Sequence, residues 1–372
     1  MTGHKKASVK GYTPTEQGDI SNVWDFTIES QNYVEKKRAQ KKNQLIELPN
    51  EPVGIAWFSD LHLGSGYTNY RQILADAKLV NETEGLYAEF HGDATDNWIV
   101  GKLQALQRGQ AVSKKLEDKM FVDWVKLVRE KLIVWCSGNH DEWTTKLTGW
   151  SPAEELLRDT PVLFDPFQIS FVLRHGGIDR TVLVRHKWRY GSIYNPTHPI
   201  EVGWDRGDID FDIGVAGHTH IGTYCRPFHR HNKRRYAILT GTYKGYDAFG
   251  EEIGFPDPKD SGCGMMVLMP GQQDLMWFDS LKQGALFLNW ARLVYKENAA
   301  KQNRISAKGN KARPAKTSAR VRATSGGNKG KSTGAKGANK SKPGKGASAV
   351  KRGSATTKRN GRNATARPSK RK

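Results

Sequence analysis

Five apolar runs constrain the possible fold of this chain more than any other feature. Each run is typical of a buried β-strand, and each is followed at once by polar residues. The runs occupy residues 54–59, 86–90, 132–136, 180–185 and 211–216. The clusters that follow them are Asp60-Leu61-His62, Gly92-Asp93-Ala94-Thr95-Asp96, Gly138-Asn139-His140-Asp141, His186 and Gly217-His218-Thr219-His220. Because the ends of successive buried strands meet at one edge of a sheet, these side chains are expected to lie together. The repeated order of strand, cluster and helix predicts one large α/β domain.

The clusters supply carboxylate, imidazole and amide groups, which are ligands of divalent metal ions. In an extended segment residues i and i+2 point the same way, so Asp60 and His62 can reach one metal, as can His218 and His220. Asn139 adds a neutral amide oxygen. Each cluster taken alone is also typical of an ordinary polar turn. Their joint occurrence at five strand ends favours two metal ions held side by side.

In this order the clusters resemble the signature of the calcineurin-like metallophosphoesterases. That signature reads Asp-x-His, Gly-Asp-x-x-Asp, Gly-Asn-His-(Asp/Glu), an isolated His and Gly-His-x-His. The resemblance implies a four-layer α/β/β/α sandwich and a metal-dependent hydrolase of phosphoester bonds. It also implies that a bridging hydroxide on a dinuclear metal centre attacks phosphorus, without a covalent enzyme intermediate.

Carried over residue by residue, the resemblance assigns seven metal ligands to two ions that share one carboxylate. The first ion would be held by Asp60, His62, Asp93 and His220, and the second by Asp93, Asn139, His186 and His218. Mixed nitrogen and oxygen ligands suit manganese, iron or zinc, and manganese is expected here. His175, which also ends a strand-like run, competes with His186 for its place.

His140 is the expected general acid, which protonates the leaving oxygen, with Asp141 orienting its ring. Asp96 is expected to bond loop amides or a ligand imidazole rather than a metal ion.

The segment between His186 and Gly217 carries the candidate substrate-binding residues Lys187, Arg189, Tyr190 and His198. Cations and aromatic rings beside a metal centre suit a phosphate flanked by a base or a sugar. Aromatic rings are equally typical of a hydrophobic core, and cations are equally typical of a solvated surface. A nucleotide or nucleic-acid phosphodiester is the expected substrate, and a phosphomonoester or a phosphoprotein is the alternative.

Residues 301–372 hold 23 of the 59 Lys and Arg residues and none of the 38 acidic residues. The first 300 residues therefore carry 36 basic against 38 acidic side chains, although the formal net charge of the chain is +21. The basic segment has no Phe, Tyr, Trp or Leu, so it buries too little apolar surface to offset its ordering entropy. It is expected to be disordered and to bind nucleic acid through the phosphates. Alternatively, this tail is the main functional element of a nucleic-acid-binding or compacting protein.

Three regions are thus expected: an N-terminal extension over residues 1–50, a catalytic domain over 51–298 and a disordered tail over 299–372. Within the extension, alternating apolar residues at 24–28 predict a short strand, and the Lys-rich stretch 35–42 predicts an exposed helix. The three cysteines form no CxxC pair, which disfavours a disulfide framework or a zinc ribbon. No run approaches the roughly 18 apolar residues of a membrane span. The protein is expected to be cytoplasmic and associated with nucleic acid.

Overall fold

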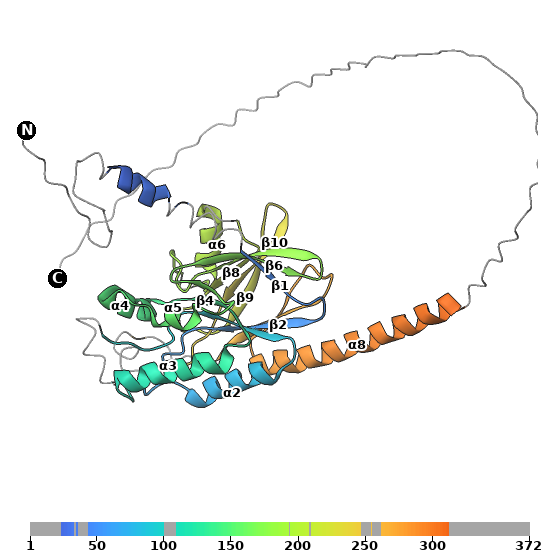
Figure 1. Cartoon of the computed structure of the whole chain (residues 1–372), viewed down its shortest axis with the longest axis horizontal. Helices are drawn as coiled ribbons and strands as arrows, with labels where there is room; N and C mark the ends of the chain where they lie inside the picture. Colours follow the sequence, from blue (N-terminus) through green and yellow to red (C-terminus); the bar gives the residue numbers. More distant parts are fainter. Residues whose placement is uncertain are drawn as a thin grey trace, which may run out of the picture. The chain divides into compact units, whose positions relative to one another are not determined.

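The computed structural model describes residues 24–32, 35, 44–99, 109–192, 194–207, 210–246, 254 and 262–311 (Figure 1). By its internal contacts the chain divides into Met1–Arg313 and Pro314–Lys372. The second of these units, which holds most of the predicted tail, lies outside the described residues.

Two six-stranded sheets form the centre of the first unit. The first sheet contains, in spatial order, β1 (Gln44–Glu47), β6 (Ile169–His175), β7 (Ile178–Val184), β8 (Ile213–Ala216), β10 (Lys233–Leu239) and β9 (Tyr224–Arg230). The second sheet contains β12 (Met276–Phe278), β11 (Gly264–Leu268), β2 (Val53–Phe58), β3 (Leu86–His91), β4 (Leu132–Cys136) and β5 (Leu163–Asp165). Both sheets are mixed, because each combines parallel and antiparallel pairs of strands.

The alternation of side chains along the strands explains why the sheets pack face to face. Along β2, Ile55 and Trp57 join an apolar cluster with Phe171 of β6 and Val182 of β7, which fills the space between the sheets. Phe58, on the other face of β2, packs instead into the cluster formed with the helices. Both faces of this strand are therefore buried, which its continuous apolar run predicts.

Helices cover the outer face of each sheet (Figure 1). Apolar residues of α2 (Tyr70–Glu82), α3 (Lys114–Val128) and α8 (Leu281–Lys311) pack on the second sheet. Ile200 of α6 (His198–Arg206) packs on the first sheet. The predicted four-layer sandwich is thus confirmed. Two shorter helices, α4 (Asn139–Thr148) and α5 (Pro152–Leu157), follow β4 along the chain.

Strand direction decides which ends of the strands meet. In the second sheet β2, β3 and β4 are parallel, and in the first sheet β7, β8 and β10 are parallel. β6 runs antiparallel to β7, and Gly176 and Gly177 turn the chain between them with φ angles of 58° and 79°. The carboxyl ends of β2, β3, β4, β7 and β8 therefore carry the loops in which the five polar clusters lie.

The observed elements cross both predicted domain boundaries. β1 pairs in parallel with β6, and Ile46 packs against the core between the sheets, so the sandwich begins before residue 51. The last helix continues from its packed part to Lys311, thirteen residues beyond 298. Each added helical residue gains one backbone hydrogen bond, so a helix that packing has started can propagate into a polar segment.

The predicted strand at 24–28 is wrong, because residues 24–32 are helical. Trp24 and Ile28 are 65% and 53% exposed. Their spacing of four residues fits one face of a helix as well as alternation fits a strand. The predicted helix at 35–42 lies outside the described residues except for Glu35. None of the described helices is both long and apolar enough to cross a lipid bilayer.

Candidate metal centre

The predicted ligands, which are spread over 160 residues of sequence, come together at the carboxyl ends of five strands. Asp60 and His62 follow β2, Asp93 follows β3, and Asn139 begins α4 directly after β4. From the other sheet, His186 follows β7, and His218 and His220 follow β8. Asp60, His62, Asp93 and His186 are each at most 3% exposed. Buried carboxylates and imidazoles at such density need a specific structural or functional reason.

Five of these residues have left-handed backbone conformations. Their φ angles are 52° for Asp60, 46° for His62, 54° for Asp93, 73° for His218 and 55° for His220. Residues other than glycine adopt such angles at a cost on the order of 1–3 kcal/mol each, and such strain concentrates at functional sites. These backbone conformations therefore cost conformational free energy, which the packing of the rest of the fold offsets.

Asp60, His62 and His220 form one group of potential metal ligands, with one donor atom from each within 4.8 Å of the others. The Nε2 atoms of His62 and His220 lie 3.1 Å apart. Oδ1 of Asp60 lies 3.0 Å from Nε2 of His220 and 3.8 Å from Nε2 of His62. Three donor atoms from β2 and β8 loops thus converge on one point between the two sheets.

Asp93, His186 and His218 form a second group of the same kind. Oδ2 of Asp93 lies 3.1 Å from Nε2 of His186 and 4.0 Å from Nε2 of His62, which belongs to the first group. Asp60 also links the groups, because its Oδ2 accepts a hydrogen bond from the backbone amide of His218. Asp93 therefore belongs to the second group, and its carboxylate also faces His62 of the first group.

The amide oxygen of Asn139 is the observation that best tests whether metal ions fit here. This Oδ1 atom is buried and has no hydrogen-bond donor among the described residues. A buried polar atom without a partner is costly, and a bound cation would give this oxygen a partner. Carboxylate, imidazole and amide donors together form a set that suits manganese, iron or zinc, so the residues fit the predicted ions.

The rings of two candidate ligands are held by hydrogen bonds to their outer nitrogens. Nδ1 of His62 lies 2.8 Å from Oδ1 of Asp96, and Nδ1 of His186 lies 2.8 Å from the carbonyl oxygen of His91. When such a ring is neutral with its proton on Nδ1, its lone pair is on Nε2, which faces the site in both cases. Asp96 thus bonds the imidazole of a candidate ligand.

Lys244 is a part of the site that the sequence did not reveal. Its Nζ lies 2.8 Å from Oδ1 of Asp96, the oxygen that also contacts His62. Lys244 is 5% exposed and follows β10, the sixth strand that ends at the site. Thr242, from the same segment, donates a hydrogen bond to the carbonyl oxygen of Asp60. The available signal was the polar Thr-Gly-Thr-Tyr-Lys segment after an apolar run, the pattern that marked the other five clusters.

His140 lies beside the ligands, but Asp141 does not orient it as predicted. Nε2 of His140 is 3.9 Å from Oδ2 of Asp93, and its Nδ1 contacts the carbonyl oxygen of Asp96. The carboxylate of Asp141 instead accepts hydrogen bonds from the backbone amides of Asp93, Ala94 and Gly138. Successive residues in the first turn of a helix point about 100° apart, so neighbours cannot face the same partner. Asp141 holds the ligand loops in place.

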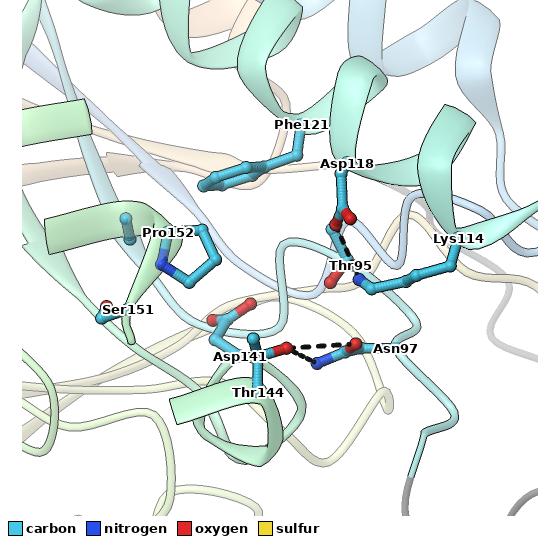
Figure 2. Close-up of a pocket in the computed structure, with 10 residues that line it drawn as sticks. Thr95, Asn97, Lys114, Asp118, Phe121, Asp141, Thr144, Ser151 and Pro152 are labelled. Atoms are coloured by element: carbon cyan, nitrogen blue, oxygen red, sulfur yellow. Dashed lines mark hydrogen bonds and ion pairs between the residues drawn. The ribbon is translucent and has the colours of Figure 1, made fainter. Parts of the chain in front are cut away.

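Figure 2 shows where Asp141 lies relative to a pocket formed with α3, α4 and α5. Asp141 is the one predicted site residue among those that line this pocket. Its neighbours there include Lys114, which pairs with Asp118, and Asn97, whose side-chain amide donates to Thr144. These contacts support a scaffolding role for this part of the molecule.

Electrostatics favour cations at the site. Burial alone would raise the pKa of Asp93, but His186 and His140 hold it well below its usual range. Burial likewise opposes protonation of the imidazoles of His62 and His186. Asp60 and Asp96 nevertheless raise the pKa of His62 to about 9. Asp93 and Asp60 raise that of His186 to about 10. The buried carboxylates stay ionised and draw positive charge to the site, and divalent ions would supply that charge.

Two glycines of the motifs allow loops to approach the ligands closely. Gly92 has a φ of 110°, and a Cβ atom there would lie 2.4 Å from Nδ1 of His186. At Gly138 a Cβ atom would lie 2.1 Å from Oδ1 of Asp93. Any side chain at these positions would displace a candidate ligand, which explains the glycine in two of the motifs.

The structure separates the two competing histidines. His186 follows β7, which is parallel to β8, so it reaches the same edge as His218. His175 ends β6, which is antiparallel to β7, and its Nε2 contacts the carbonyl oxygen of Glu51 at 2.7 Å. His175 thus lies at the opposite edge of the sheet, and His186 remains the predicted ligand.

The four predicted substrate-binding residues have different surroundings. Lys187 is exposed and lines a small apolar pocket with Trp188 and His218. Arg189 and Tyr190 are exposed as well, and Tyr190 has a φ of 69° with the guanidinium of Arg206 4.9 Å above its ring. His198, half-buried at the start of α6, is not among the residues that line this pocket. Their roles remain predictions.

No protein-family model matches the chain, and no curated protein matches it in sequence. Among solved structures, the chain is similar to Vps29 of Chaetomium thermophilum, with a TM-score of 0.34 and 11% identity over 60% of this chain and 85% of that one. It is also similar to the NAD nucleotidase NadN of Haemophilus influenzae, with a TM-score of 0.32 and 10% identity. That match covers 61% of this chain and 49% of NadN, so the chain spans about half the length of NadN.

Proposed function

We propose that this protein is a metal-dependent hydrolase of phosphoester bonds that uses two divalent metal ions. The observation that carries the proposal is the convergence of the predicted ligands into two groups that both face Asp93. The unpartnered buried oxygen of Asn139 supports it independently. Asp60, His62 and His220 would hold one ion, Asn139, His186 and His218 the other, and Asp93 would serve both.

Such ions, when bound, would activate a water molecule for attack on phosphorus and neutralise the phosphoryl oxygens. The protein's own contribution is to position those ligands and to move a proton. His140 is the proposed general acid, because its Nδ1 is fixed by the Asp96 carbonyl while its Nε2 faces Asp93. A proton on that Nε2 would pass to the leaving oxygen.

Burial lowers the pKa of His140 to about 4, so the ring is neutral at pH 7 in the absence of substrate. A negative charge brought close to an imidazole raises its pKa. An anionic phosphoester bound beside His140 would therefore help the ring to take up the proton that it then donates.

A nucleotide or nucleic-acid phosphodiester is the proposed substrate, and manganese is the proposed metal. The exposed cation Lys187, which lines a pocket together with His218, supports a phosphate ligand with a further group attached. The 23 cations of residues 301–372 support association with nucleic acid. The proposed localisation is therefore cytoplasmic and associated with nucleic acid. A phosphomonoesterase or a protein phosphatase is the alternative enzyme.

The decisive experiment is a hydrolysis screen on protein stripped of metal with EDTA and then supplied with manganese, iron or zinc. The substrates are bis-p-nitrophenyl phosphate, p-nitrophenyl phosphate, cyclic nucleotides, a phosphopeptide and labelled DNA. We expect activity on phosphodiesters to vanish on stripping and to return best with manganese. Full activity in the stripped protein would refute the metal mechanism.

A second candidate, a nucleic-acid-binding or compacting protein whose main functional element is the basic tail, is favoured by one observation, the absence of acidic residues in that tail. The same screen, combined with a measurement of DNA binding, separates the candidates. Tight DNA binding with no hydrolysis of any substrate, whichever metal is supplied, would select this second one.

A further inference from the structure

One face of α4 carries an apolar row that leads away from the candidate metal centre. Asn139, Trp143 and Leu147 are spaced by four residues, so they lie on one side of the helix. Trp150 follows just after Gly149, which ends the helix with a φ of 74°. Leu147 and Trp150 are 59% and 53% exposed. An exposed leucine and an exposed tryptophan that follow a half-buried tryptophan beside a candidate active site call for an explanation.

The row begins in direct contact with the proposed general acid. The rings of His140 and Trp143 lie 4.1 Å apart between centroids, with an angle of 33° between their planes. Trp98 closes the group, with its ring centroid 5.3 Å from that of Trp143 and 4.8 Å from that of His140. Trp98 is 8% exposed, whereas Trp143 is only half-buried. Trp143 is thus the indole of this group that offers surface to a ligand.

We propose that this row, Trp143, Leu147 and Trp150, binds unpaired bases of single-stranded nucleic acid on the leaving-group side of the cleaved phosphodiester. The proposal rests on the proposed function, because the phosphate is placed at the metal centre. If His140 protonates the leaving oxygen, the nucleoside attached to that oxygen lies next to Trp143. The base of that nucleoside would stack on the indole.

The chemistry of the row fits nucleobases better than a peptide or a phosphoprotein. Base stacking on an aromatic side chain tolerates any sequence, because every base presents a π-face. Lys146, in the last turn of α4, is exposed and supplies a cation for the backbone that connects the bases. Trp150 lies beyond the C-cap of α4, whereas Trp143 contacts His140, so we expect only substrates longer than a dinucleotide to reach Trp150.

The first test compares two dinucleotides that differ in the base on the leaving side, thymidylyl-thymidine and an analogue with an abasic leaving sugar. We expect Trp143→Ala to lower kcat/KM for the complete dinucleotide by about 5- to 150-fold, the range for loss of one base stack. The abasic analogue should lose much less, and Trp143→Phe should restore most of the difference. An equal loss on both dinucleotides would show that Trp143 only supports His140, and would overturn the proposal.

The second test uses Trp150→Ala with an oligothymidylate and with the dinucleotide. We expect KM to rise for the oligonucleotide alone. Trp290→Ala is the matched control, because Trp290 is 59% exposed on α8, a helix on the outer face of the second sheet. The proposal fails if the two variants behave alike.

A binding measurement distinguishes failure of this proposal from failure of the proposed function. Fluorescence anisotropy of a labelled oligothymidylate, in EDTA and at about 0.5 M salt, suppresses both hydrolysis and the electrostatic contribution of the basic tail. Weaker binding by Trp143→Ala and Trp150→Ala, in a protein that hydrolyses nothing, would support the row and reject the hydrolase. Unchanged binding by both variants, in a protein that is active, would reject the row alone.

Discussion

At the scale of single residues, Asp93 and Asp96 organise the candidate metal centre in different ways. Asp93 faces donor atoms of both ligand groups, with distances of 3.1 Å to His186 and 4.0 Å to His62. Asp96 holds the outer nitrogen of His62 with its carboxylate and that of His140 with its backbone carbonyl. Substitution of the first should therefore affect the metal ions directly, whereas the second acts through the rings that it orients.

We expect Asp93→Asn to lower the metal content at both positions, from two ions per chain to fewer than one. Asparagine tolerates the left-handed φ of 54° found here, so the change removes the charge without straining the backbone. Metal content is measured by mass spectrometry after dialysis, with the exposed Asp123→Asn as control. Retention of both ions in Asp93→Asn would show that Asp93 is not shared between them.

His186→Ala should lower the metal content to about one ion per chain. His175→Ala should leave the metal content unchanged, because that ring contacts Glu51 at the opposite edge of the sheet. It should instead lower the free energy of unfolding by about 1 kcal/mol, the usual value of one hydrogen bond. The opposite pattern of metal loss would make His175 the ligand.

For His140→Ala, both ions should remain bound while turnover falls by about 10²- to 10⁴-fold, the usual contribution of general-acid catalysis. The loss should shrink for nitrophenyl esters, because nitrophenolate leaves without needing a proton. Metal content and kcat for both kinds of substrate are measured on the same preparation. Loss of metal would instead identify His140 as a ligand.

At the scale of elements, one buried hydrogen-bonded chain joins an outer helix to the metal site. Asp76 of α2 accepts a hydrogen bond from the hydroxyl of Tyr243, and the backbone amide of Tyr243 donates to the carbonyl oxygen of Asp60. Asp76 is 3% exposed, and burial raises its pKa. Helix α2 therefore supports the loop that carries the candidate ligand Asp60. It does so through Asp76, whose ionisation is disfavoured by burial.

This raised pKa predicts a pH dependence of stability. The unfolded chain releases the Asp76 proton at lower pH than the folded protein does, so stability falls as the pH rises above the unfolded value and levels off above the folded pKa. Asp76→Asn removes that loss and still accepts from Tyr243. Thermal unfolding followed from pH 4 to 7 should therefore show a flatter decline in the variant. A steeper decline would mean that the ionised carboxylate stabilises the fold.

At the scale of the whole molecule, charge is divided between two regions. The first 300 residues carry 36 basic and 38 acidic side chains, and the remainder carries 23 basic and none acidic. Affinity for nucleic acid and chemistry at the metal centre should therefore be separable, because the candidate ligands all precede residue 221.

A truncation after Lys311 spares α8 and removes 19 of the 23 tail cations. It should abolish most affinity for duplex DNA and flatten the salt dependence of binding. A protein that makes about 6–10 phosphate contacts loses about 10³- to 10⁵-fold in affinity when salt rises from 50 to 200 mM. Hydrolysis of a nitrophenyl ester should be unchanged. Equal DNA affinity of the truncated and full chains would place the nucleic-acid site on the folded body.

The sequence by itself determined the strands and the residues that gather at their ends. Apolar runs such as 54–59 and 132–136 became β2 and β4, and the segment between Gly138 and Asp141 became the start of α4. These predictions succeed because burial periodicity and the residues that end a strand are local properties of the chain.

Only the tertiary structure decided how distant residues pair. Lys244 meets Asp96 across 148 residues, and the pairing of β6 with β7 places His175, the competitor of His186, against Glu51. Asp141 turned towards backbone amides because it lies in the first helical turn beside His140. Strand direction and side-chain direction in a turn depend on how the layers pack, which no local pattern encodes.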